Sequence, residues 1–142
     1  MQDSSRSLRG RLFCVGVRWD FWLEGGIARL AIKTVNLKAD MPSLQEALQR
    51  LERELALARQ EKHSILKLVH GYGSSGAGGD IRIAVQRRLH DLVEAGQVRG
   101  CIFGEEWSKT NDATWRLLQA QSGLKSDPDL GRRNRGITVV LL

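Results

Sequence analysis

The chain carries the sequence Leu-Val-His-Gly-Tyr-Gly-Ser-Ser-Gly-Ala-Gly-Gly-Asp at residues 68–80, and this stretch decides how its neighbours fold. The apolar run 64–69 predicts a strand, and the amphipathic segment that starts with Asp80 as a cap and ends at Gly96 predicts a helix. The glycines between them allow positive φ angles and keep side chains away from the backbone. Because a helix N-terminus bears the positive end of the helix dipole, the sequence predicts a loop that binds an anion, with phosphate as the first choice.

The length, composition and net charge of the chain fit a single domain with a basic surface. The chain has 142 residues, of which 42% are hydrophobic, and a formal net charge of +6. Such a charge favours a polyanionic partner, DNA or RNA, because basic surfaces attract phosphate backbones. A membrane partner is not expected, since no apolar run approaches the ~20 residues that span a bilayer. The two cysteines, Cys14 and Cys101, are far apart in the sequence and are expected to be reduced thiols of a cytoplasmic protein.

Residues 1–29 are hard to assign to the domain. The first ten residues are polar, whereas apolar residues alternate along residues 12–23 as they do in a strand. Residues 24–26 (Glu-Gly-Gly) are what a translated ribosome-binding site would give. The region is therefore a disordered extension, an added hairpin or a mis-assigned start, and the domain is expected over residues 30–142.

The rest of the chain alternates between strand and helix signals. Ser43 and Glu46 form the spacing of a capping box, which predicts a helix from there to about Gln60. Strands are expected at 30–37, 64–69, 98–103 and 137–142, and helices at 43–60 and 80–96. A long insertion, residues 104–135, precedes the last strand and includes a short helix capped by Asn111 or Asp112 and a flexible basic loop at 131–136.

The order β-α-β-α-β-β predicts an α/β fold, specifically an α+β two-layer sandwich. A small mixed four-stranded sheet would be covered by two helices. Strands separated by a helix should be parallel, and the last strand should pair antiparallel at or beside the third. The glycine loop also fits the dinucleotide pattern G-x-G-x-x-G at residues 71–76. Because the sheet is short and no acidic residue ends the next strand, nucleotide binding is only an alternative.

The loop and the last strand together resemble the Smr (small MutS-related) domain family. That family carries His-Gly-x-Gly followed by a Leu-Arg-x-x-Val helix, and here His70-Gly71-Tyr72-Gly73 leads into Ile81-Arg82-x-x-Val85. Its closing strand, Gly-Val-Thr-Val-Val-x-Leu, is matched by Gly-Ile-Thr-Val-Val-Leu-Leu at residues 136–142. The resemblance covers roughly residues 30–142.

The resemblance implies nucleic-acid binding and, in some members, nicking of DNA or cleavage of RNA. The family's first strand usually ends Leu-Asp-Leu-His, whereas this chain has Asn36 and Lys38 in place of the aspartate and the histidine. Asn36 cannot act as a general base, and Lys38 would bind phosphate rather than move its protons. The resemblance therefore supports binding more than cleavage, and a nuclease would need a replacement acid, such as Asp40 or Asp80.

The predicted function is a nucleic-acid-binding domain that grips backbone phosphates through the glycine loop and the N-terminus of the next helix. His70 would contact phosphate or act as acid or base; alternatively its ring bonds a loop carbonyl and holds the loop. Tyr72 would stack on a base or pack on the loop. The predicted binding residues are Lys38, His70, Gly71, Tyr72, Gly73, Ser74, Ser75, Gly76, Arg82, Lys109, Arg132, Arg133 and Arg135.

Two other functions stay open. The first is a structure-selective endonuclease with His70 as its catalytic residue, which alone would call for Mg²⁺ or Mn²⁺; otherwise no metal site and no cofactor are predicted. The second is a nucleotide-binding or protein-interaction module. The sequence leaves open the choice between DNA and RNA and the oligomeric state.

Overall fold

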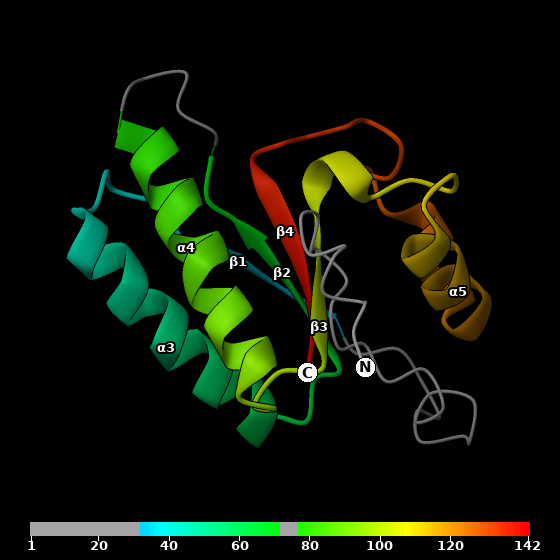
Figure 1. Cartoon of the computed structure of the whole chain (residues 1–142), viewed down its shortest axis with the longest axis horizontal. Coiled ribbons are helices and arrows are strands. Elements are labelled where there is room, and N and C mark those ends of the chain that lie inside the picture. Colours follow the sequence, from blue (N-terminus) through cyan, green and yellow to red (C-terminus); the bar gives the residue numbers. More distant parts are fainter. Residues whose placement is uncertain (1–31, 72–76) are drawn as a thin grey trace.

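A computed structural model describes residues 32–71 and 77–142, which form one sheet with helices on both sides (Figure 1). The elements follow the order β1 (Ile32–Asn36), α3 (Leu44–Gln60), β2 (Ile65–Val69), α4 (Ala77–Glu94), β3 (Gly100–Phe103), η2 (Gly104–Glu106), α5 (Asp112–Ala120), η3 (Ser122–Ser126) and β4 (Ile137–Leu141). The predicted order of strands and helices is confirmed, with element ends shifted by a few residues. Residues 1–29 lie outside the described residues.

The sheet is mixed and has four strands in the order β1-β2-β4-β3. β1 and β2, which α3 separates, run parallel, as expected for strands joined through a helix. β4 runs antiparallel to β3, as predicted, but it also pairs antiparallel with β2 and so occupies the centre of the sheet. The end of the chain thus separates β2 from β3, and Thr138 on β4 lies opposite both Leu68 and Phe103.

Local sequence signals account for the helix starts. Ser43 caps α3 by the expected capping box, because its hydroxyl accepts from the backbone N–H of Glu46 while the Glu46 carboxylate accepts from the N–H of Ser43. Asn111 caps α5 through the backbone N–H of Thr114. The prediction that Asp80 caps the next helix is wrong: α4 begins at Ala77, and Asp80 lies in its first turn, where a carboxylate also suits the helix dipole.

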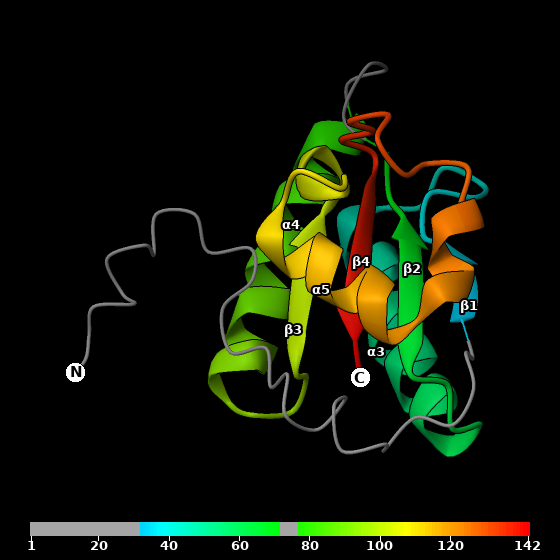
Figure 2. The ribbon, with the colours of Figure 1, turned by 90° about the vertical axis from the view of Figure 1, so that its right-hand side faces the viewer.

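The insertion between β3 and β4 adds a third layer to the predicted two. Helices α3 and α4 cover one face of the sheet, and α5 and η3 cover the other (Figures 1 and 2). Two separate apolar clusters fill these spaces, one under α3 and α4 and one that includes Trp107, Leu117 and Leu124 from the insertion. Because both faces of the sheet are covered, every residue of β4 is buried, and alternation between apolar and polar residues is lost.

The turn at residues 131–136, expected to be a flexible loop, is fixed against the end of β3. A Cβ atom on Gly104 would lie 1.7 Å from the carbonyl oxygen of Asn134, so only glycine allows this approach. The Asn134 side chain accepts from the N–H of Gly136, and the N–H of Gly131 donates to the carbonyl of Trp107. These contacts attach the basic turn to the end of the sheet.

We expect Gly104→Ala to destabilise the fold by about 2 kcal/mol or more, because the new methyl group must displace the backbone of the turn. Urea unfolding measures the change. Gly96→Ala is the matched comparison: Gly96 has a φ of 75° but open space around it, so only backbone strain of about 1 kcal/mol applies. Equal losses for the two variants would contradict the close approach at Gly104.

Candidate nucleic-acid interface

His70, at the end of β2, is enclosed and uses both ring nitrogens. Its side chain is 0% exposed. Nδ1 lies 2.7 Å from the carbonyl oxygen of Gly71, which can only accept, so Nδ1 carries the proton. Nε2 then accepts from the hydroxyl of Thr138 at 2.8 Å. The bond to Gly71 agrees with the alternative in which the ring bonds a loop carbonyl.

The surroundings keep His70 neutral. Burial lowers the pKa of His70, and the nearby charge of Arg82 lowers it further, whereas the bond to Gly71 and the charge of Glu105 act in the opposite direction. Arg82 itself forms an ion pair with Glu105, with Nη2 and Oε2 3.2 Å apart. Arg82 on α4, predicted to reach an anion, therefore pairs with a carboxylate close to His70.

The carbonyl of Gly136 joins the basic turn to the end of β2. It accepts the backbone N–H groups of both His70 and Gly71, at 2.9 and 3.0 Å. Gly71 has a φ of 78°, which favours glycine at this junction. A Cβ on Gly71 would lie 3.4 Å from Cδ of Lys38, so the β1–α3 loop reaches the same place. Three segments distant in sequence thus meet at this end of the sheet.

Asn36 stabilises the loop after β1. It stands at the position where the Smr family, which the sequence resembles, has aspartate. The side-chain oxygen of Asn36 accepts from the N–H of Lys38 at 2.9 Å. Arg50 of α3 donates to the carbonyls of Asn36 and Ala39, at 3.4 and 3.1 Å. Asn36 therefore shapes the loop without supplying a charge, and the Lys38 residue is exposed.

The basic turn surrounds an open hollow of about 490 Å³. It is lined by Asp129, Arg132, Arg133, Asn134 and Arg135. The structure thus brings together three of the predicted arginines around one hollow. Lys109 is exposed in the connection between η2 and α5 and is not one of the lining residues.

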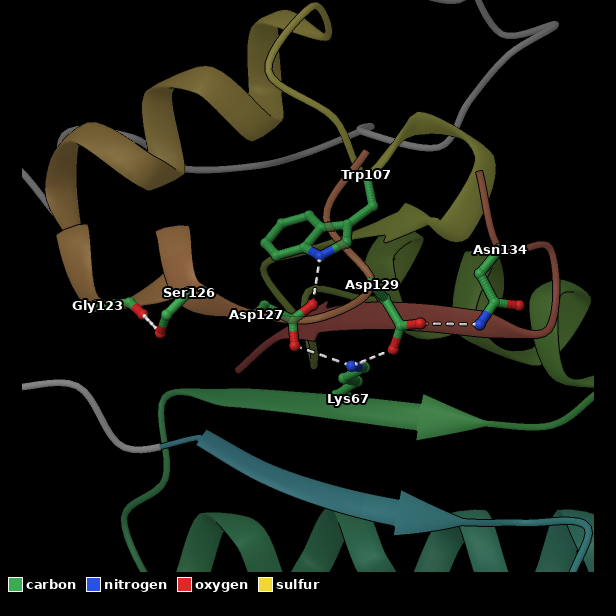
Figure 3. A network of polar contacts seen from close by, with 7 residues as sticks. All are labelled: Lys67, Trp107, Gly123, Ser126, Asp127, Asp129 and Asn134. Carbon is green, nitrogen blue, oxygen red and sulfur yellow. Dashed lines mark hydrogen bonds and ion pairs between the residues drawn. The ribbon is translucent and has the colours of Figure 1, made fainter. Parts of the chain in front are cut away.

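A buried lysine anchors the segment that carries this turn (Figure 3). Lys67, in the middle of β2, is 8% exposed and contacts the carboxylates of Asp127 and Asp129. The indole N–H of Trp107 donates to Asp127 at 2.8 Å, and the amide of Asn134 donates to Asp129 at 3.0 Å. Each carboxylate therefore links Lys67 to another part of the insertion.

The Lys67 cluster stays charged. Burial by itself lowers the pKa of Lys67, but hydrogen bonds to Asp127 and Asp129 outweigh it and raise that pKa. The hydrogen bond from Lys67 lowers the pKa of Asp129, with a further contribution from Asn134, against the opposing effect of burial. At neutral pH Lys67 and Asp129 are therefore both charged and form an ion pair.

Some predicted residues fall outside the described part of the chain. Tyr72, Gly73, Ser74, Ser75 and Gly76 lie between the two described ranges, and their role stays a prediction. Asp40 and Asp80, considered as replacement acids for a nuclease, are both exposed.

Sequence reasoning missed three residues that shape the site. Lys67 and Thr138 are the lone polar residues of their strands, Ile65–Val69 and Ile137–Leu141, and such isolated polar residues are a signal for a buried partner. Glu105 gave no comparable signal, because its pairing with Arg82 depends on how β3 ends beside α4.

Neither a metal centre nor a membrane span can be assigned from the described residues. Within 32–71 and 77–142, no group of three or more His, Cys, Asp or Glu side chains is placed to hold a metal ion. In the same ranges no helix combines the length and the apolar character needed to cross a bilayer.

No protein-family model matches the chain, and no curated protein matches it. Among solved structures, the crystal structure of the Smr domain of Thermus thermophilus MutS2 matches with 24% sequence identity and a TM-score of 0.48. The chain is similar to that Smr domain. The match covers 78% of this chain and 96% of that chain.

We expect Thr138→Val to lower the free energy of unfolding by about 1–3 kcal/mol, because Nε2 of His70 would stay buried without its donor. Thr34→Val is the matched control, since Thr34 is exposed on β1 and the same chemical change there should stay within about 0.5 kcal/mol. Urea unfolding of both variants measures the difference. A Thr138→Val variant as stable as the wild type would contradict the hydroxyl–imidazole bond.

We expect stability to fall as the pH drops below about 6.5, the ordinary pKa of histidine. The unfolded chain then binds a proton that folded His70 takes up only at lower pH, so stability rises with pH by up to about 1.4 kcal/mol per unit within this window. His70→Asn offers an amide donor to Gly71 but cannot titrate, so its stability should change less between pH 7 and 5. Parallel pH profiles for the two proteins would refute the neutral, buried imidazole.

Proposed function

We propose that this chain binds nucleic acid by gripping backbone phosphates at the end of the sheet where Lys38, Gly71 and the turn 131–136 meet. The observation that carries the proposal is the Gly136 carbonyl, which accepts from both His70 and Gly71 and so fixes the basic turn beside the strand end. Lysine and arginine side chains around rigid backbone are the usual means of holding a phosphate backbone.

The distribution of charge supports the proposal. Arg132, Arg133 and Lys38 are exposed, and the chain as a whole has a formal net charge of +6. The lining of the hollow brings the arginines of the turn within one small volume, where several donors could contact successive phosphates. Contacts of this kind give affinity that depends on salt and little choice of base sequence.

The geometry supports binding more than cleavage. His70 is neutral and enclosed, with one nitrogen donating to Gly71 and the other accepting from Thr138, so it fits a positioning role better than an acid–base role. The endonuclease, for which Mg²⁺ or Mn²⁺ would be needed, therefore stays an alternative with less support. The nucleotide-binding or protein-interaction module is the other alternative, and its ligand would not show the steep salt dependence of a polyanion.

The test measures affinity for a short DNA duplex and for its RNA equivalent over a series of salt concentrations. We expect the affinity of the wild type to fall steeply with salt. The double variant Arg132→Gln/Arg133→Gln should bind more weakly at every salt concentration, with a slope smaller by about two, because each lost phosphate contact lowers it by about one.

The matched control is Arg53→Gln/Lys62→Gln, which removes the same charge from exposed positions on α3 and just after its C-terminal end. If general charge alone drives binding, the two double variants will weaken it equally, and the proposed site is wrong. Affinity that stays flat as salt rises would reject phosphate binding altogether and favour the protein-interaction alternative.

A further inference from the structure

The loop between β1 and α3 presents an exposed methionine. Met41 is 88% exposed, a high value for a large apolar side chain. A methionine at a loop tip that packs against nothing loses the apolar burial that usually favours it. Single apolar side chains are common on protein surfaces, so the exposure of Met41 gains meaning only together with the backbone of its loop.

The loop that carries Met41 is strongly fastened. Arg50 donates to the carbonyl of Ala39 at 3.1 Å, and the N–H of Met41 donates to the carbonyl of Lys38 at 3.3 Å. Pro42, the next residue, is buried, and the capping box at Ser43 starts α3 directly after it. These contacts fix the backbone of the loop around Met41, and its side chain extends into solvent.

The backbone of this loop is also strained. Asp40 and Met41 have φ values of 65° and 49°, so two successive residues other than glycine adopt the left-handed conformation. Aspartate tolerates this conformation, but methionine gains nothing from it. Strain that the surrounding structure maintains is characteristic of residues placed for a contact.

We propose that Met41 inserts against an unstacked nucleobase, so that the domain favours nucleic acid with an unpaired or bulged base over a fully paired duplex. This inference rests on the proposed function. Lys38 leads into the same loop and reaches the Gly71 junction, so a backbone held there passes close to the loop. The carboxylate of Asp40 disfavours a phosphate at the loop tip, which leaves a base to face Met41.

The flexible thioether side chain of methionine suits contact with a nucleobase. Apolar side chains, methionine among them, act as wedges between bases in proteins that bend nucleic acid. A base that is already unpaired needs less energy to unstack, so a wedge discriminates in favour of bulges and against perfect duplexes. Polarisable sulfur also makes favourable contacts with flat aromatic rings.

The experiment compares two DNA duplexes that differ by one bulged 2-aminopurine, whose fluorescence reports unstacking. We expect the wild type to bind the bulged duplex roughly fivefold more tightly, as one sulfur–ring contact would give, and to change its fluorescence. Met41→Asn should abolish the preference while leaving affinity for the paired duplex and its salt slope unchanged. Because asparagine tolerates the left-handed conformation, the same variant should have a higher Tm than the wild type.

Two controls isolate the side chain. Met41→Leu keeps an apolar wedge and should retain the preference, and Trp115→Ala removes an exposed apolar side chain from α5, on the other face of the sheet. The same pair of probes made in RNA shows whether the wedge serves DNA, RNA or both.

The outcomes separate the inference from the proposed function. If Met41→Asn keeps the preference for the bulge, the inference is overturned while phosphate gripping stands. If Met41→Asn lowers the Tm and weakens binding to both duplexes, Met41 serves the fold and the inference is likewise overturned. If the wild type binds neither duplex in a salt-dependent way, the proposed function is wrong and the inference falls with it.

Discussion

The structure depends on the charge of Lys67, which lies on a strand whose other residues are all apolar. A buried ammonium group is tolerated only when carboxylates surround it, and here Asp127 and Asp129 come from the segment after η3. Such a network adds little net stability compared with apolar packing, yet removing one partner is strongly destabilising. The network also constrains the path of the chain, because the segment with Asp127 and Asp129 must lie beside the middle of β2 before β4 begins.

The path of the insertion beside β2 also positions the basic turn. Asp129 bonds to Asn134, whose backbone carbonyl lies against Gly104 and whose side chain accepts from Gly136. The carbonyl of Gly136 then accepts from His70 and Gly71, so the contacts lead from the buried lysine to the strand end. The arginines between these fixed points have a rigid backbone beneath them, which reduces the entropy lost when they contact phosphate.

The sequence predicted the elements that local patterns encode. The capping box of Ser43, a cap at Asn111 or Asp112 and the parallel pairing across α3 follow from local patterns, and the structure has the box, Asn111 as the cap and the parallel pair. The insertion of β4 beside β2 was not predicted, because strand order depends on how the insertion packs. For the same reason, the coverage of both sheet faces and the pairing of Arg82 with Glu105 could not be derived from spacing alone.

Carboxylates beside the cations limit how strongly this end of the sheet attracts phosphate. Glu105 already occupies Arg82, and Asp129 lies among the arginines of the hollow. Arg82 and Glu105 are both partly buried, and Nε of Arg82 and Oε1 of Glu105 are enclosed, so separating this pair costs more than breaking an exposed ion pair. Asp129 is held in place by Lys67 and Asn134, and it cannot be displaced without disturbing the insertion. Phosphate therefore has easier access to the exposed Lys38, Arg132 and Arg133 than to the partly buried Arg82.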